Sequence, residues 1–260
     1  MKQPLPAWAL PDDQRYLLVF DIHQNIRWLE RVLEAESGNY DHLILGGDYF
    51  DPYDPPPTTA TALETAAFLN GLLESQGEAL TILLGNHDLP YLVASRMADP
   101  GLFFHPFSDI KVYDTQTAKE LAAALNPEFW SRGQLFATVH SYLLSHAGVA
   151  EEFWLNTDSV EASLQQLWQE AGLALAEAKQ RRHPLLEPGR VRGGERQERG
   201  GITWQDWNVE FSDEAIPLPQ IVGHTRSPSG ARQNGRSWCL DGQQSCYGIL
   251  DSNGLEVRSV

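Results

Sequence analysis

Five separate stretches of the chain place aspartate, histidine or asparagine directly after an apolar run. The most compact is Gly85-Asn86-His87-Asp88, which follows the apolar residues 79–84. Oxygen and imidazole nitrogen without sulfur form a ligand set that suits divalent metals of hard to borderline character. A histidine taken alone is more often a core or surface residue, but five such stretches together favour a common site. The five groups are Asp21 with His23, Asp48 with Asp51, Asn86 with His87 and Asp88, His146, and His224.

This set contains enough donors for two divalent cations. Two cations about 3.5–4 Å apart can stabilise both the attacking and the leaving oxygen of an in-line displacement. Holding them so close requires a shared carboxylate, and a water between them loses its proton near neutral pH and becomes the nucleophile. A further histidine that is not a ligand can protonate the leaving oxygen, oriented by a carboxylate. The residue types therefore favour metal-dependent hydrolysis.

Short apolar runs that alternate with helical patterns must position these groups. The alternation predicts one α/β domain over residues 1–260, with the polar groups at strand ends along one sheet edge, where open α/β sheets bind ligands. Strands are predicted at 16–20, 42–45, 79–84, 134–139, 141–144, 216–222, 237–240 and 247–250, with a last strand after a turn at 251–254. Helices are predicted at 26–36, from 58 or 59 to about 76, and at 90–97, 115–125 and 159–182.

Composition limits the partners of the chain. The formal charge of −16 argues against general nucleic-acid or anionic-membrane binding, although bound cations can still attract a polyanionic substrate. The first ten residues lack a signal-peptide pattern, and no apolar run approaches the roughly 18 residues of a membrane span. These features predict a soluble cytoplasmic protein. Cys239 and Cys246 are expected to be a reduced, buried pair.

One long segment lacks apolar periodicity. Residues 183–201 are rich in Arg, Glu and Gly, which predicts a mobile surface loop. Together with the aromatic residues at 204–207, this loop could form a lid over a substrate. The remaining histidines have no motif around them and are predicted to be structural or exposed: His42, His105, His140 and His183.

The ordered groups resemble the motifs of the calcineurin-like metallophosphoesterases. The matching stretches are D-x-H at 21–23, GD-x-x-D at 47–51, GNHD at 85–88, Ser-His-Ala-Gly at 145–148 and Gly-His-Thr at 223–225. The last two, with 240–242 and 247–248, are most similar to the branch of serine/threonine protein phosphatases and symmetrical dinucleoside tetraphosphatases. The resemblance implies a four-layer α/β/β/α sandwich.

The resemblance also implies roles for individual residues. His87 would be the general acid, oriented by Asp51, and Asp88 would support the site from behind the ligands. Asp241 could hydrogen-bond a ligand histidine. The implied cofactors are two divalent ions, with Mn²⁺, Fe or Zn²⁺ as candidates. Asp21 and His23 would hold one ion, Asp48 would bridge, and Asn86, His146 and His224 would hold the other.

Three positions depart from that branch. Pro52 and Leu84 stand where its members carry arginines that clamp phosphate, and Gln24 replaces a glycine. Phosphate contacts must then come from other residues, because an arginine fork is not reproduced by metal alone. The leading substrate-binding candidates are Arg226, which directly follows the Gly-His-Thr stretch, and Arg199. Arg190, Arg192 and Arg196 are the others in the Gly-rich segment, for which a solvated loop is the competing interpretation.

These observations predict a phosphatase-like enzyme that hydrolyses phosphomonoesters or phosphoanhydrides through a metal-bridging hydroxide. A phosphorylated small molecule, a nucleotide or a phosphoprotein would be the substrate. A dinucleoside polyphosphate hydrolase or a phosphodiesterase is the alternative within enzymes. A non-catalytic scaffold of the same fold is the alternative of another class, and the presence of both His87 and Asp51 argues against it.

Overall fold

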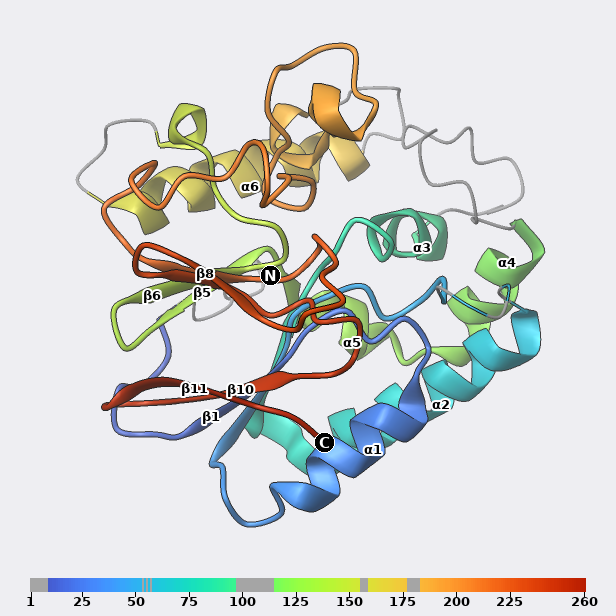
Figure 1. Ribbon diagram of the computed structural model, residues 1–260. Helices are drawn as coiled ribbons and strands as arrows, with labels where there is room; N and C mark the ends of the chain where they lie inside the picture. Colours follow the sequence, from blue (N-terminus) through green and yellow to red (C-terminus); the bar gives the residue numbers. More distant parts are fainter. Residues whose placement is uncertain are drawn as a thin grey trace.

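The computed structural model describes residues 9–52, 54, 56, 58–96, 115–154, 159–176 and 183–260. Two β-sheets pack face to face, and helices cover their outer sides (Figure 1). This is the four-layer α/β/β/α arrangement that the resemblance implies. The ends of two predicted helices, at 97 and at 177–182, and the histidine at 105 lie outside the described residues.

The first sheet carries three of the five polar groups. Its parallel strands keep a level register, with Val19 opposite Leu45 and Leu45 opposite Ile82, so that their carboxyl ends reach one edge together. On the other side of β1, strand β10 pairs with it in the antiparallel direction. The strand order is β11 (Gly254–Arg258), β10 (Tyr247–Asp251), β1 (Tyr16–Val19), β2 (His42–Leu45), β3 (Leu80–Leu83) and β4 (Gly133–Gln134).

The second sheet carries the other two groups. The expectation that all five groups lie at the edge of one sheet is therefore wrong, because His146 and His224 follow β6 and β7, which pair in this second sheet. The strand predicted at 134–139 is also wrong as a single element, since the chain changes sheets at Leu135. The order is β5 (Phe136–Val139), β6 (Tyr142–Ser145), β7 (Gln220–Val222), β9 (Ser237–Cys239) and β8 (Arg232–Asn234).

Helices form the two outer layers. Helices α1 (Ile26–Ala35) and α2 (Thr59–Gln76) lie on the outer side of the first sheet, and α6 (Val160–Ala176) lies beyond the second (Figure 1). Thr58 caps α2, as expected, because its hydroxyl accepts from the Thr61 amide. The remaining helices are α3 (Leu89–Ser95), α4 (Thr115–Ala124), α5 (Pro127–Arg132) and the 3₁₀ helices η1 (Gly77–Ala79), η3 (Glu151–Phe153), η4 (Pro184–Leu186) and η5 (Arg190–Arg192).

Strand β1 shows how the layers are held together. Leu17 and Val19 face the core that contains α1 and α2, whereas Tyr16 and Leu18 belong to the cluster between the two sheets. Successive side chains of a strand point to opposite faces, so a fully apolar run is required where both faces are buried. This is why the site-bearing strands begin as uninterrupted apolar sequence.

The segment 183–201 contains η4 and η5 but neither an α-helix nor a β-strand. Leu185 and Leu186 are buried, and Gly201 donates to the Glu187 carbonyl at 2.9 Å. Its mobility stays a prediction. Cys239 and Cys246 are buried and unbridged, as predicted. None of the helices in the described part of the chain combines the length and apolar composition needed to cross a membrane.

Candidate metal centre

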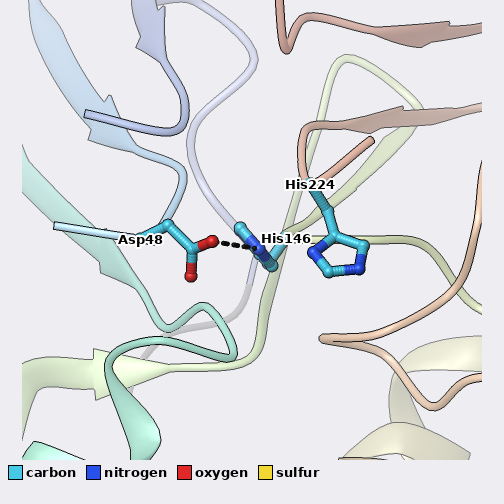
Figure 2. A group of neighbouring side chains, drawn as sticks. All are labelled: Asp48, His146 and His224. Atoms are coloured by element: carbon cyan, nitrogen blue, oxygen red, sulfur yellow. Dashed lines mark ion pairs between the residues drawn. The ribbon is translucent and has the colours of Figure 1, made fainter. Parts of the chain in front are cut away.

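The Asp48 carboxylate lies between two histidines from different sheets. Its Oδ2 is 3.5 Å from Nε2 of His23 and 3.3 Å from Nε2 of His146. Asp48 follows β2, whereas His146 follows β6, and Figure 2 shows both side chains pointing toward one another with His224 beside them. A carboxylate in this position can serve two ligand groups at once.

Two overlapping groups of side chains could each hold a metal ion. Within each group, one possible ligand atom per residue lies within 4.8 Å of the others. Asp48 belongs to both, and the amide oxygen of Asn86 lies 3.2 Å from Nε2 of His146. The groups are Asp21, His23 and Asp48, and Asp48, His146 and His224. The structure thus brings together all six residues predicted as metal ligands.

The backbone fixes which nitrogen of each imidazole faces the centre. Nδ1 of His23 donates to the Asp51 carbonyl at 2.7 Å, and Nδ1 of His146 donates to the Gly46 carbonyl at 2.9 Å. Both Nε2 atoms are therefore left as neutral ligands, the usual arrangement at metal sites. Nε2 of His224 is buried without a hydrogen-bond partner among the described residues. A buried donor or acceptor without a partner is costly, and a bound cation would satisfy it.

The ligand-bearing loops adopt a backbone conformation that ordinary side chains disfavour. The φ angles are positive at Asp21 (53°), His23 (44°), Asp48 (56°) and His224 (66°). Such strain costs roughly 1–3 kcal/mol per residue and persists where the surrounding structure enforces it. Here the amide of His224 donates to both oxygens of Asp21 at 3.1 and 3.0 Å, which ties the two sheets together at the centre.

Three glycines leave room for the ligands. A Cβ atom at Gly223 would lie 2.0 Å from Oδ2 of Asp21, and one at Gly85 would lie 2.1 Å from Oδ1 of Asp48. Gly47 has φ +93°, and a Cβ there would meet the Gly85 amide nitrogen at 2.5 Å. Gly85 and Gly223 are therefore explained by the close approach of their backbone to a carboxylate, and Gly47 by its positive φ and its contact with the Gly85 backbone.

Asp88 supports the loops from behind the ligands. Its Oδ2 accepts from the amides of Asp48 at 2.7 Å and Gly85 at 2.8 Å, and its Oδ1 accepts from Tyr49 at 2.9 Å. The side chain is fully buried. It therefore joins the loop after β2 to the loop after β3, in line with the supporting role expected from the sequence.

The electrostatics of the centre favour a cation. Burial and the neighbouring carboxylates of Asp241 and Asp48 hold the pKa of Asp21 well above its usual range. Burial, followed by the charge of Asp48, raises the pKa of Asp88 to about 7 and contributes to raising that of Asp241 to about 6. Buried carboxylates that repel one another are stabilised by positive charge. The donor set and its charge therefore fit divalent metal ions.

The histidines respond to burial in different ways. Burial lowers the pKa of His23 to about 4 and holds that of His224 well below its usual range, so both are neutral and able to bind metal. Burial also opposes charge on His146, but the carboxylate of Asp48 raises its pKa to about 10. A divalent cation bound by Asp48 and His146 would release this proton, because a histidine must be neutral to bind metal.

His87 is held apart from the ligands by a chain of hydrogen bonds. Its Nδ1 lies 2.9 Å from Oδ2 of Asp51, and the Tyr91 hydroxyl donates to Oδ1 of the same carboxylate at 2.6 Å. The His87 ring is 5.2 Å from the ring of His23, and its side chain is 23% exposed. Burial by itself would lower the pKa of His87, but the charge of Asp48 and the hydrogen bond to Asp51 outweigh it and raise the pKa above its ordinary value. A protonated imidazole next to the centre suits a general acid.

The sequence does not identify Tyr91 as a member of this chain of hydrogen bonds. The only available signal is its position four residues after His87, on the helix that follows the motif.

Of the five candidate arginines, Arg192 has the clearest connection to the centre. Its Nη2 donates to Oγ1 of Thr225 at 2.9 Å and pairs with Asp206 at 2.9 Å, and its positive charge helps to lower the pKa of His224. Arg226 is exposed, and its positive charge acts to lower the pKa of Asp241.

The other three arginines of segment 183–201 pair with glutamates in or next to this segment. Arg199 lies 3.4 Å from Glu152, Arg190 lies 3.0 Å from Glu198, and Arg196 lies 3.8 Å from Glu187. The sequence could not single out Arg192, because all four arginines share the same local composition.

The remaining predicted residues have structural surroundings. His42 is buried and hydrogen-bonded to Thr81 at 2.8 Å, His140 donates to the Gln14 carbonyl at 3.0 Å, and His183 caps η4. Asp241 is buried and accepts from the Gln243 amide at 3.1 Å. The Trp204 ring packs edge-on against His224 at 5.7 Å, so part of the predicted lid region lines the centre.

The chain matches one family model and shares its fold with several solved structures. The family model described as calcineurin-like phosphoesterase matches residues 15–225. The cold-active protein-tyrosine phosphatase of a psychrophilic Shewanella species is 14% identical, with a TM-score of 0.61, covering 96% of this chain and 80% of that one. A protein serine/threonine phosphatase from Saccharomyces cerevisiae is 12% identical, with a TM-score of 0.54, covering 98% and 84%.

A third similar structure is described provisionally as a diadenosine tetraphosphatase. It is 15% identical, with a TM-score of 0.52, covering 98% of this chain and 97% of that one. At these identities the structural similarity shows a shared fold and nothing about substrate. No curated protein matches the chain at a significant level.

Proposed function

Since the chain belongs to the calcineurin-like phosphoesterase family, we propose that it is a dinuclear-metal-dependent phosphatase acting on phosphomonoesters or phosphoanhydrides. The observation that carries this proposal is the position of Asp48, shared by the two groups that could hold a metal. Asp21 and His23 would hold one ion with Asp48, and Asn86, His146 and His224 would hold the other.

Two bound divalent cations supply a nucleophile by lowering the pKa of water and stabilise the charge of an in-line displacement. The side chains of this protein perform the remaining tasks. Asp48, Asp21 and the neutral histidines would hold the ions, and Asp88 keeps the loops that carry these ligands in place. His87 gives a proton to the leaving oxygen while Asp51 orients its ring. Metal identity and a cytoplasmic location remain predictions.

Phosphate must be held without the two arginines of the similar phosphatase branch. Arg192 supports this role, because it reaches Thr225, the residue directly after the ligand His224, and Asp206 fixes its guanidinium. Arginine binds phosphate oxygens through paired hydrogen bonds. We therefore propose Arg192 as the phosphate-binding residue, ahead of Arg199 and Arg226.

The test of the proposed function combines metal content with turnover. Wild-type protein loaded with Mn²⁺ should hydrolyse phenyl phosphate, and a chelator should abolish the reaction. Asp48→Asn removes the shared carboxylate charge and should lose both bound metal and activity. Asp13→Asn changes an exposed aspartate remote in sequence from the motifs and should leave both unchanged. Full activity in Asp48→Asn would refute the mechanism.

A dinucleoside polyphosphate hydrolase is the second candidate. It is supported by the fold shared with the structure described as a diadenosine tetraphosphatase. A comparison of diadenosine tetraphosphate with phenyl phosphate on the same metal-loaded protein separates the two candidates. The scaffold alternative is disfavoured because the hydrogen bonds from Tyr91 and His87 to Asp51 build a proton donor that a scaffold does not need.

A further inference from the structure

A cavity of about 240 Å³ opens beside His23, next to the metal centre. Three side-chain amides and a hydroxyl line it, from Gln24, Asn25, Gln244 and Thr61. The described residues of its wall include no lysine or arginine, and Asp54 is the charged residue among them. Pro52, which stands where the similar phosphatases have an arginine, forms another part of the wall. Among the described residues, the wall is therefore polar and carries no basic side chain that could pair with an anion.

The amides of the wall are fixed in place. Gln244 donates to the Ile22 carbonyl at 2.9 Å and accepts from Asn25 at 2.7 Å. The Thr61 hydroxyl lies 2.8 Å from Oε1 of Gln24, which leaves Nε2 of Gln24 as its donor group. Gln24 and Gln244 both have a φ of 61°, so each of the two loops that carry them holds a conformation that such residues disfavour. Preorganised amides of this kind suit recognition of hydroxyl or amide groups.

The cavity lies on the side of the centre where the acid acts. Its wall includes His23, whose ring is 5.2 Å from the ring of His87, and Pro52, which directly follows the Asp51 that orients His87. If His87 gives its proton to the leaving oxygen, as the proposed function requires, the group attached to that oxygen can extend past His23 into the cavity.

We propose that this cavity binds the leaving group of the substrate, and that the leaving group is small, uncharged and rich in hydroxyl or amide groups, as in a sugar or a nucleoside. Water gives up one proton to the solvent and adds to phosphorus, the bond from phosphorus to the leaving oxygen breaks, and that oxygen takes the proton of His87. The products are the free alcohol and inorganic phosphate, and His87 regains a proton from water. An anionic leaving group would meet Asp54 instead of a cation.

Two matched pairs of substrates test the cavity on the metal-loaded protein. Adenosine 5′-monophosphate releases a neutral nucleoside, whereas the terminal phosphate of adenosine 5′-diphosphate leaves from an anion. Glucose 6-phosphate and 6-phosphogluconate form the corresponding sugar pair. We expect kcat/KM to be about tenfold or more higher for the neutral member of at least one pair, and the pair that responds tells nucleoside from sugar.

Substitutions of Gln24 assign the effect to the cavity. Gln24→Leu should raise KM for the preferred neutral substrate about three- to tenfold, the worth of one hydrogen bond, and should affect phenyl phosphate, which lacks hydroxyl groups on its ring, less. Gln24→Arg should shift the preference toward the anionic member. Gln233→Leu alters an exposed glutamine on β8 and should change neither.

Equal kcat/KM within both pairs, or a loss in Gln24→Leu that is as large with phenyl phosphate, would overturn the proposal while leaving the phosphatase function intact. Absence of phenyl phosphate hydrolysis would instead overturn the proposed function. In that event, calorimetric binding of adenosine and of glucose tests the cavity independently of activity. If wild-type protein binds one of these compounds and Gln24→Leu weakens the binding, the cavity proposal is supported. If wild-type protein binds neither, the proposal is refuted.

Discussion

His87 meets Asp51 through Nδ1, at 2.9 Å from Oδ2, and this contact leaves Nε2 as the nitrogen available for proton transfer. The other oxygen of Asp51 accepts from Tyr91. The carboxylate is therefore fixed at both oxygens, and the imidazole inherits its orientation. His87→Ala should keep its metals and lose about 10²–10⁴ in kcat. Tyr91→Phe should lose much less.

Leaving groups of different acidity provide the control for His87. A phenolate that departs without help needs no acid, so the deficit of His87→Ala should be smaller with p-nitrophenyl phosphate than with phenyl phosphate. Metal content is measured alongside turnover. Loss of metal in His87→Ala, or an equal deficit with both substrates, would show that His87 is not the acid.

The glycines next to the carboxylates should be intolerant of a single methyl group. Gly223→Ala would push a Cβ into Asp21, and Gly85→Ala would push one into Asp48, at 2.0 and 2.1 Å. Metal affinity, measured by calorimetry, should fall roughly 10–100-fold in each, as for other changes that displace a ligand. Gly71→Ala lies in an exposed position of α2 with nothing within 4 Å of the added atom. It should stabilise the protein by about 0.5–1 kcal/mol without affecting metal.

Arg192 and Arg190 offer a matched pair within η5. Arg192 contacts Thr225, whereas Arg190 pairs with Glu198 on the surface. Arg192→Ala should raise KM for a phosphate ester about 10–100-fold, because a charge-assisted contact is lost. Arg192→Lys should recover part of this, since lysine keeps the charge but not the fork.

Arg190→Ala should leave KM unchanged. Thermal unfolding of each variant shows whether the unpaired Asp206 destabilises the protein. If both alanine variants have similar KM values, Arg192 is not the phosphate-binding residue.

Glu36 links the end of α1 to the last hairpin and predicts a pH dependence of stability. Burial raises the pKa of Glu36, but the hydrogen bonds from Arg258 at 2.8 Å and Tyr247 at 2.7 Å bring it below its ordinary value. A lowered folded pKa contributes stability above the unfolded pKa, and this contribution is lost as pH falls through the folded pKa.

Glu36→Gln should therefore lower the free energy of unfolding by about 1–3 kcal/mol at pH 7, and the difference from wild type should shrink as the pH falls below about 4. Denaturant unfolding at several pH values measures it. Glu34→Gln, which changes an exposed residue of the same helix, is the control. A difference that does not vary with pH would exclude the ionised pair as its source.

Much of the fold follows from local pattern. Runs such as 42–45 are apolar on both faces and end in polar residues, which predicts buried parallel strands whose ends carry the site. Strand β8, Arg232–Asn234, is half-buried to exposed and carries no such signal. The assignment of strands to two sheets depends on contacts between distant residues, and the break at Leu135 leaves no trace in local hydrophobicity.

The site shows the same limit. Residue type and motif order identified the side chains that lie around Asp48, because each follows its own strand directly. Arg192, Tyr91 and Gln244 reach the site from segments whose local sequence is ordinary. Their roles arise from partners far along the chain, such as Thr225 for Arg192 and Ile22 for Gln244. Pattern alone could not reveal them.

The hydrogen bonds between Asp21 and His224 join residues 203 positions apart. During synthesis, the amino-terminal half of the centre emerges long before its carboxyl-terminal partners exist. The hydrogen bonds from the His224 amide to Asp21 can form only after the strand before His224 has been synthesised. A chain truncated before His224 would therefore keep the group of Asp21, His23 and Asp48 but lack the second group, which needs His146 and His224.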